Sequence, residues 1–335
     1  MDAPELDQIT FLNRLKVLIP PNDSLVPVLA DLLETSPDSI YRRMRAETAL
    51  TFEEIKLICN HFKISFDAYT QANTDNVTFQ YTPMENGEMS FKEYLISIRE
   101  DLKKLKSSNN PKITYSCEDI PIFHLLYTYP LGSFKMVYWM RTILNVESFM
   151  QTKFNLGVVT DDLKHISKEI YDLYSSIPST EIWTDRTIYG TLRQIEYFWE
   201  SGMFETKKDA IRVLKSLRKT IRNIESQASE GSKSASSENN FKLYYSDIAL
   251  TNNCALVDMG NIRAAYLGHF SFTTIRTTNA VYCEQTDDWL NNIIRKSTLI
   301  SAVGEKTRYQ FFSRMYNNIE EVVRKIDPDF NEFDK

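Results

Sequence analysis

Three arginines lie within four consecutive positions near the start of the chain, Arg42, Arg43 and Arg45, in a segment that also contains Asp38. A guanidinium group can form a bidentate pair with guanine or neutralise a phosphate, and a carboxylate can accept a hydrogen bond from the amino group of cytosine. Each good bidentate pair discriminates between bases by about 1 to 3 kcal/mol. These side chains have the chemistry for contact with nucleic acid, provided that they point outward together.

A short helix is expected to carry these side chains. Ser36 is a good N-cap residue, and Pro37 follows it at the first helical position, where its fixed φ suits helix entry. The helix is expected to run to about Arg45. A helix turns by about 100° per residue, so Arg42 points outward when Ile40 is directed toward the core. The predicted contact residues are Ser36, Pro37, Asp38, Ser39, Tyr41, Arg42, Arg43 and Arg45.

Flanking helices must hold this segment in place. The spacing of apolar residues predicts helices over residues 5–19, 25–33 and 52–62, and Ser65 is expected to begin a fifth short helix. Thr51 and Glu54 fit the capping box, in which a hydroxyl and a carboxylate satisfy each other's backbone donors. The predicted buried side of the fourth helix comprises Phe52, Ile55, Ile58, Cys59 and Phe62.

The segment from Leu29 to Tyr69 resembles the Cro/repressor, or lambda-repressor-like, helix-turn-helix family. The residues that carry the resemblance are Leu29-Ala30-Asp31-Leu32-Leu33, Ser36-Pro37-Asp38-Ser39-Ile40, the helix from Phe52 to Phe62, and Ile64-Ser65. The resemblance covers about a fifth of the chain. It implies a five-helix domain over residues 1–72, whose third helix reads the major groove of double-stranded DNA, in a transcriptional regulator that binds as a homodimer.

Two positions depart from the family pattern. Such domains usually carry Gly at the end of the recognition helix and an apolar residue three places after the core isoleucine, where this chain has Ala46 and Arg43. Met44 can supply the second contact, because a residue four places on lies as near to the same helix face. We therefore expect Arg43 at the edge of the DNA-facing side, in contact with a phosphate.

The charge of this region tempers the prediction. Residues 1–72 hold seven Lys and Arg against eleven Asp and Glu, a net charge of −4, and the whole chain has a net charge of −6. Nonspecific coating of nucleic acid needs a broad basic surface, so any DNA contact must be local. A single module is expected to bind DNA weakly. The negative net charge of residues 1–72 is also compatible with the alternative that this module binds protein and makes no specific contact with DNA.

The length of 335 residues favours two or three domains. We expect a multidomain, mainly α protein with a linker at 73–89, a mainly helical domain at 90–228 and a polar loop at 229–240. Within the helical domain, residues 112–126 are apolar and β-branched enough to hold a strand or two. Residues 241–335 are expected to be α+β, with an antiparallel meander over 243–250, 254–259, 262–267 and 270–274, and could form one unit with the helical domain. This region is expected to sense a small-molecule or protein effector and to mediate oligomerisation.

Two further helix patterns lie in this part of the chain. The helix expected at residues 207–224 carries basic residues at spacings of three and four, which place them along one side: Lys208, Arg212, Lys215, Lys219 and Arg222. This basic stripe could be a solvated helix face, an auxiliary contact with the DNA backbone or a site for an anionic ligand. The helix expected at 305–326 carries a short heptad-like seam, for which core packing is favoured over a dimer contact.

Catalytic and metal-binding patterns find little support. The sequence has no Gly-rich phosphate loop, no H-E-x-x-H and no G-x-S-x-G, and its four cysteines form no C-x-x-C pair. We therefore expect no catalytic site, metal or cofactor. An enzyme in the C-terminal region stays as an alternative only because that region is large. Without a long apolar run or a secretory signal, the protein is expected to be soluble and cytoplasmic, with no membrane partner.

Overall fold

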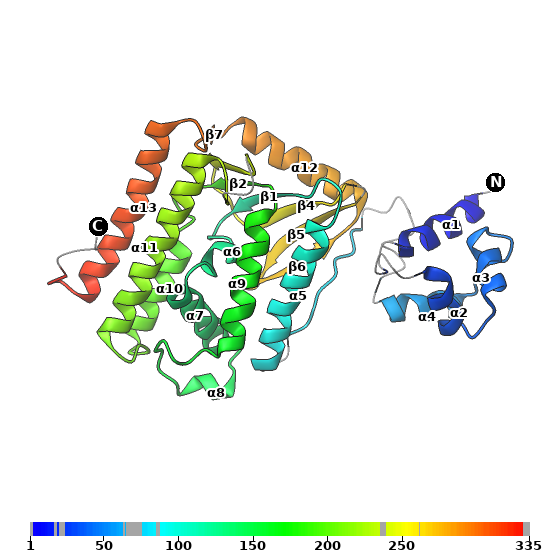
Figure 1. Cartoon of the computed structure of the whole chain (residues 1–335), viewed down its shortest axis with the longest axis horizontal. Coiled ribbons are helices and arrows are strands. Elements are labelled where there is room, and N and C mark those ends of the chain that lie inside the picture. The colour runs from blue at the N-terminus through cyan, green and yellow to red at the C-terminus, as the bar shows by residue number, and fades with distance from the viewer. Residues whose placement is uncertain are drawn as a thin grey trace. The chain divides into compact units, whose positions relative to one another are not determined.

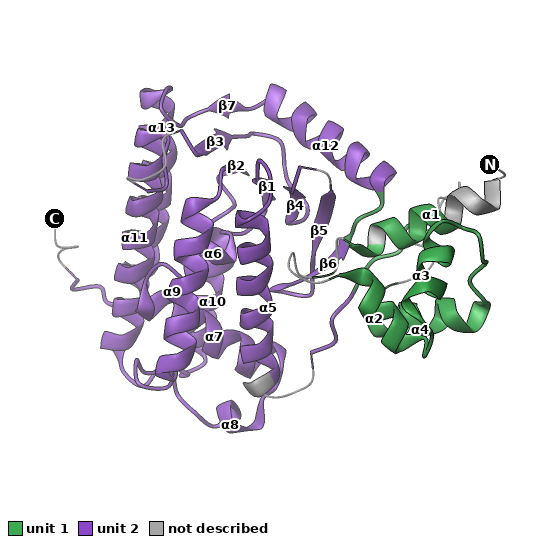
Figure 2. Ribbon diagram, turned by 45° about the vertical axis from the view of Figure 1, so that its right-hand side comes forward, with its two compact units in different colours: residues 1–80, 277–279 green, residues 81–276, 280–335 purple. Residues whose placement is uncertain are grey.

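The computed structural model divides the chain into two compact units (Figure 2), residues 1–80 with 277–279 as unit 1 and residues 81–276 with 280–335 as unit 2. The residues that it describes are 3–16, 19, 24–62, 64, 76–84, 88–234, 239–260 and 262–330.

Unit 1 contains four described helices: α1 (Ala3–Leu15), α2 (Leu25–Leu32), α3 (Pro37–Met44) and α4 (Phe52–Phe62) (Figure 1). Helix α3 packs against α1 and α2, and α2 packs against α4. Their shared core includes Leu12, Leu15, Leu29, Ile40 and Ile58, each no more than 1% exposed. The fifth helix expected from Ser65 lies outside the described residues.

Helix caps set the ends of α3 and α4. The hydroxyl of Ser36 accepts a hydrogen bond from the backbone N–H of Ser39 at 3.3 Å. The Thr51 N–H donates to the Glu54 carboxylate at 2.8 Å, and the Glu54 N–H donates to the Thr51 hydroxyl at 3.2 Å. Both predicted caps are confirmed, because each side chain satisfies a donor that lacks a partner within its helix.

The predicted buried side of α4 is wrong at its first residue. Phe52 is 77% exposed, whereas Ile58 is fully buried and Ile55 is partly covered. Phe52 lies in the first turn of the helix, directly after Thr51. The three- and four-residue spacing therefore describes the middle of α4 and does not extend to its N-terminus.

Unit 2 is built on one seven-stranded sheet in the order β6-β5-β4-β1-β2-β3-β7. The strands are β1 (Lys112–Cys117), β2 (Ser179–Trp183), β3 (Phe241–Tyr245), β4 (Cys254–Asp258), β5 (Arg263–His269), β6 (Thr273–Thr277) and β7 (Thr298–Leu299). Strands β1, β2 and β3 are parallel, while β4 is antiparallel to β1 and β5, and β7 is antiparallel to β3. The parallel strands are joined through helices, as parallel pairing requires.

This mixed sheet corrects the expected C-terminal antiparallel sheet. Its centre is formed by β1 and β2, which come from the region expected to be mainly helical; β1 lies within residues 112–126, where a strand or two could be expected, whereas no strand is expected from the sequence at β2. The expected four-stranded meander is confirmed for β4, β5 and β6, which are neighbours in the sheet, but it is wrong for its first strand, because β3 pairs with β2 and β7 on the far side of β1. The chain is thus a mixture of helix and sheet, and mainly α describes it only roughly.

The helices of unit 2 cover both faces of the sheet (Figure 1). They are α5 (Glu88–Lys106), α6 (Ile122–Leu125), α7 (Tyr129–Tyr138), the π-helical turn η3 (Trp139–Ile143), α8 (Glu147–Met150), α9 (Asp161–Ser176), α10 (Tyr189–Glu200), α11 (Lys207–Glu230), α12 (Ala280–Arg295) and α13 (Glu305–Ile326). Ile182 packs in the core that includes α12, and Trp183 packs in the larger core with the other helices. Neighbouring strand residues point to opposite faces, so α12 covers one face and the larger helical layer the other.

The segment expected to be an unpacked polar loop is partly buried. Helix α11 continues to Glu230, and Gly231 ends it with a φ of 68°. Lys233 and Asn240 are 5% and 6% exposed. Their polar atoms are hydrogen-bonded within the protein, which allows them to leave water at a lower cost.

The last helix matches its prediction. α13 spans Glu305–Ile326, and the seam residues are at most 5% exposed: Phe312, Met315, Ile319, Val322 and Ile326. They pack in the core of unit 2, where α13 lies mainly against α11. Among the described residues, no helix has the length and apolar character to cross a membrane.

Candidate nucleic-acid interface

Helix α3 has one buried side and one exposed side. Ile40 is 1% exposed and lies in the core of unit 1, and Met44 packs partly buried against the same core, as the departure from the family pattern requires. On the opposite side, the side chains of Asp38 and Arg42 are 74% and 60% exposed. The rotation predicted from the sequence therefore matches the structure for this pair.

The other residues predicted for contact fall into two groups. Ser36, Pro37, Tyr41 and Arg45 are exposed together with Asp38 and Arg42. Ser39 and Arg43 are partly covered. Six of the eight predicted residues are thus exposed, and we call these six the α3 outer face.

Both arginines of the α3 outer face form exposed ion pairs. Arg42 Nε lies 3.3 Å from an oxygen of Asp38, and Arg45 donates two hydrogen bonds to Glu47 at 2.6 and 3.1 Å. These hydrogen bonds lower the pKa of Glu47. Exposed pairs of this kind contribute little to stability, so a phosphate or a guanine base can replace either carboxylate at little cost.

Arg43 is held inside unit 1, which corrects its assignment as a phosphate contact. Its side chain is 14% exposed, and its guanidinium donates to Glu54 at 2.6 and 3.3 Å and to the Ser39 hydroxyl at 2.5 Å. Partial burial acts to raise the pKa of Glu54, but the hydrogen bonds from Arg43 and from the Thr51 N–H outweigh burial and lower it. Arg43 therefore joins α3 to the start of α4 instead of pointing toward a ligand.

A single amide from α1 supports the C-terminal end of α3. The Gln8 side chain donates to the carbonyls of Arg43 and Thr48, both at 2.8 Å, and accepts from the N–H of Leu50 at 2.8 Å. Ala46 adopts a φ of 59° within this loop, the left-handed conformation that usually calls for glycine. Gln8 thus holds the loop that follows Arg45, and with it the end of the α3 outer face.

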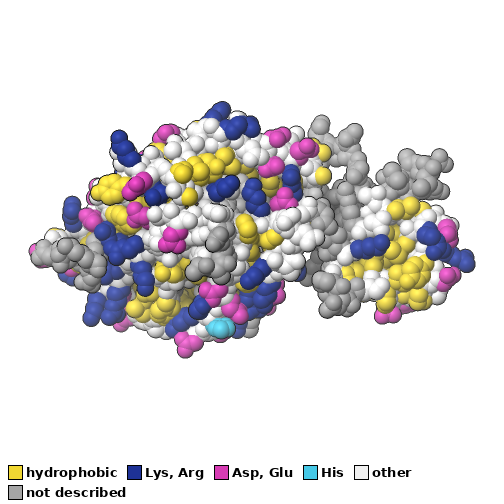
Figure 3. Space-filling view, turned by 45° about the horizontal axis from the view of Figure 1, so that its top comes forward, with side chains coloured by type: hydrophobic (Ala, Val, Ile, Leu, Met, Phe, Trp, Pro, Cys, Tyr) yellow, Lys and Arg dark blue, Asp and Glu magenta, His cyan; other side chains and the backbone are white. Residues whose placement is uncertain are grey.

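Charge alone does not single out one binding surface. On the face seen in Figure 3, Lys and Arg side chains are interspersed with Asp and Glu over unit 2, and hydrophobic side chains gather on unit 1. The large exposed hydrophobic residues of unit 1 include Tyr41, Phe52 and Leu57. Any DNA recognition by unit 1 therefore depends on a few placed side chains and not on a broad basic field.

A second group of functional side chains lies at the centre of the unit 2 sheet. Glu181 on β2 is fully buried, with one oxygen 2.8 Å from His124 Nε2 and the other accepting a hydrogen bond from Trp183 Nε1 at 2.7 Å. The Tyr174 hydroxyl also donates to Glu181. Burial acts to raise the pKa of Glu181, but attraction and hydrogen bonds from His124 and Tyr174 outweigh burial and lower it.

Lys233 completes this buried polar network. Its ammonium donates at 2.8 Å both to the Tyr174 carbonyl and to the Ser179 hydroxyl, and burial lowers its pKa to about 7 against the attraction of Glu181. Perturbed titratable groups often mark active sites. Here His124, Glu181 and Lys233 are at most 5% exposed, and their hydrogen bonds join β2 to α6, α9 and the segment after α11, while His124 Nδ1 is buried without a hydrogen-bond partner.

Sequence reasoning missed this network, because His124 and Lys233 are far along the chain from Tyr174 and Glu181 and no motif spacing connects them. A glutamate inside a strand was the one available signal, since a buried carboxylate requires partners. Among the described residues, no group of three or more His, Cys, Asp or Glu side chains is arranged to hold a metal ion. Comparisons of the chain with protein-family models, with curated proteins and with solved structures found no match.

Proposed function

We propose that this protein is a sequence-specific DNA-binding transcriptional regulator, in which unit 1 contacts double-stranded DNA through the α3 outer face. The observation that carries the proposal is the arrangement of α3. Ile40 holds the helix in the core, while Arg42 and Arg45 extend from its exposed side in weak ion pairs. A short helix with exposed guanidinium groups is suited to contact base edges and phosphates in a major groove.

The roles of the two arginines differ in this proposal. Arg42 lies in the last turn of α3 beside Asp38, and its guanidinium is assigned to guanine. Arg45 caps the C-terminal end of the helix and is assigned to a phosphate, which positions the module but carries no base specificity. Arg43 has no part in DNA contact, since its charge supports α4.

A homodimer follows from the charge of unit 1. With a net charge of −4 over residues 1–72, one module gains little from the general attraction of DNA. Two modules on two half-sites multiply the few specific contacts. We assign to unit 2 the remaining tasks of a regulator, namely binding an effector and bringing two copies together.

Selection of bound duplexes from a random DNA pool with the full chain tests this proposal. We expect a recurrent sequence, arranged as two half-sites, whose binding weakens as salt rises because each phosphate contact releases counterions. Selection without any enriched sequence would refute it.

A second candidate is a protein-binding module without specific DNA contact. It is favoured by the exposure of Phe52, Leu57 and Tyr41, which are 77%, 47% and 48% exposed, together with the acidic sum of unit 1. Exposed apolar side chains of this size are common at protein interfaces. DNA association that is weak and insensitive to salt would support this candidate over the first.

A further inference from the structure

A basic cavity of about 420 Å³ lies along α11 in unit 2. Its lining comprises Tyr127, Lys215, Arg218, Lys219, Arg222, Asn223 and Ser226. Three members of the basic stripe noted in the sequence, Lys215, Lys219 and Arg222, are thus gathered at one cavity together with Arg218. The other two members, Lys208 and Arg212, lie nearer the start of the same helix.

The cations of this cavity lie close enough to repel one another. Lys215 and Lys219 are four residues apart on α11, as are Arg218 and Arg222, and like charges at this spacing destabilise a helix. Glu320 offsets part of the repulsion through an ion pair with Arg218 at 3.1 Å. Within the part of the chain that the structure describes, Lys219 and Arg222 form no ion pair with an acidic side chain. A bound anion would therefore relieve the repulsion on Lys219 and Arg222.

Other polar side chains near the cavity form hydrogen bonds within the protein. Glu225 accepts a hydrogen bond from Tyr316, and the Asn223 amide donates to the Tyr171 hydroxyl at 2.9 Å. The ring centroids of Tyr127 and Tyr171 are 4.9 Å apart. Tyr127, the aromatic residue that lines this cavity, therefore packs against Tyr171 before any ligand binds, which reduces the cost of ordering it.

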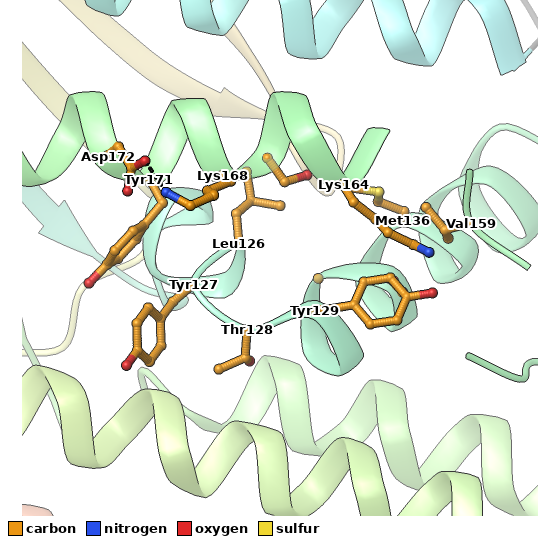
Figure 4. A pocket seen from close by; sticks show the side chains of 13 residues that line it. Leu126, Tyr127, Thr128, Tyr129, Met136, Val159, Lys164, Lys168, Tyr171 and Asp172 are labelled. Carbon is orange, nitrogen blue, oxygen red and sulfur yellow. Dashed lines mark hydrogen bonds and ion pairs between the residues drawn. The ribbon is translucent and has the colours of Figure 1, made fainter. Parts of the chain in front are cut away.

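A second cavity of about 400 Å³ shares Tyr127 with the first and lies among α7, α9 and the segment before α7 (Figure 4). Its lining includes Tyr127, Tyr129 and Tyr171. The two lysines of this cavity form ion pairs with nearby carboxylates, and Lys168 is paired with Asp172. Lys164 pairs with Asp161 and lies over the Tyr129 ring. The hydroxyl of Ser133, a residue that is 2% exposed and also lines this cavity, has no hydrogen-bond partner. Because its lysines are already paired, this tyrosine cavity is better suited to an uncharged, polar part of a ligand than to an anion.

We propose that the basic cavity binds the phosphate group of a small phosphorylated molecule, with Lys219 and Arg222 as its principal partners. The two cavities have Tyr127 as a common lining residue, and together they offer room for a charged group on one side of this residue and an uncharged part on the other. That arrangement favours a small molecule over a nucleic-acid strand, although both sources offer phosphate. Such a molecule would be the effector of the proposed regulator, but its binding does not depend on DNA recognition by unit 1.

Titration of the full chain with inorganic pyrophosphate tests the assignment. The variant Lys219→Gln with Arg222→Gln removes two exposed charges from the cavity, and Lys208→Gln with Arg212→Gln removes two from the same helix outside it. We expect saturable binding by the wild type. We expect the cavity variant to bind about tenfold or more weakly and the control variant within about twofold of wild type, since hydrogen bonds between ions are the strong ones. Pyrophosphate should also raise the melting temperature of the wild type and of the control variant.

Three results would overturn the proposal. The first is the absence of saturable pyrophosphate binding by the wild type. The second is an equal loss in both variants, which would indicate a general electrostatic field. The third is found with duplex DNA of unrelated sequence: if the cavity variant loses DNA affinity while its pyrophosphate binding is unchanged, the phosphate belongs to DNA. Failure of DNA recognition by α3 would leave the pyrophosphate result intact, so the two proposals are tested separately.

Discussion

The Arg43–Glu54 pair is the most direct test of how the structure reassigns a residue. Replacement of Arg43 by Met keeps the length of the side chain and removes its hydrogen-bond donors. Replacement of Glu54 by Gln removes the charge but keeps a side chain that can still complete the capping box with Thr51. The double variant completes a thermodynamic cycle that isolates the energy of the pair.

The expected magnitude follows from the geometry. The guanidinium donates to both Glu54 oxygens, at 3.3 and 2.6 Å, and both side chains are less than 20% exposed. Pairs of this kind exceed the value of an exposed ion pair, and residues in one network show interaction energies of about 0.5 to 3 kcal/mol. We expect an interaction energy of about 1 to 2 kcal/mol. The Arg43 variant should lose more stability than the Glu54 variant, because it also loses the bonds to Ser39.

The assay must report on unit 1 alone. All four tryptophans, Trp139, Trp183, Trp199 and Trp289, lie in unit 2, so intrinsic tryptophan fluorescence does not monitor α1 to α4. Hydrogen exchange followed by mass spectrometry resolves peptides from α2, α3 and α4 within the full chain, and peptides from unit 2 serve as an internal control. The opening free energy of the α3 peptides gives each corner of the cycle.

An interaction energy below about 0.3 kcal/mol, within the range found for independent sites, would refute the structural role of Arg43. The same conclusion would follow if the Arg43 variant reduced DNA affinity without changing exchange in α3 and α4.

The remaining predictions concern the α3 support, a strained turn and the buried lysine. Ala46→Gly should stabilise unit 1 by about 1 kcal/mol because φ at this position is 59°, whereas Ala30→Gly inside α2 should destabilise it by a similar amount; slower and faster hydrogen exchange would report these changes. Gln8→Ala should speed exchange in the loop at residues 46–50, since it removes three hydrogen bonds, and unchanged exchange there would contradict the support role. Burial lowers the pKa of Lys233 to about 7 in the folded state, so the unfolded state binds more protons at this residue between about pH 7 and pH 10, and the contribution of Lys233 to stability against urea should rise across this window. Lys233→Met should abolish that rise, and an identical pH dependence in both proteins would be inconsistent with the buried charge.

Local signals account for what could be predicted of unit 1. The hydroxyl of Ser36 and the pair Thr51 and Glu54 act on backbone groups within three residues, so their caps could be inferred without knowledge of the fold. The rotation about Ile40 placed Asp38 and Arg42 correctly for the same reason. The predicted phosphate contact of Arg43 is wrong because the position of this side chain depends on Glu54. Glu54 belongs to the next helix, and a projection of α3 alone does not include it.

Long-range pairing explains what could not be predicted of unit 2. Strand β2 contains Glu181, which is unusual for a buried strand, and its partners His124 and Tyr174 come from other elements. β3 was grouped with the strands that follow it in sequence, but it pairs with β2, the preceding strand, after a crossover through α10 and α11. Periodicity identifies a strand and says nothing about its neighbour in the sheet. By contrast, α13 was placed correctly because its apolar spacing persists along its whole length.

The central claim is that the α3 outer face reads DNA, and one comparison tests it most directly. The affinity of the full chain for its selected site is measured for the wild type, for Arg42→Ala with Arg45→Ala, and for Lys16→Ala with Lys56→Ala, which removes the same charge from exposed positions elsewhere in unit 1. We predict that the α3 variant binds about tenfold to a thousandfold more weakly and loses preference at the guanine contacted by Arg42, while the control changes little. Equal affinities for the wild type and the α3 variant would contradict the account.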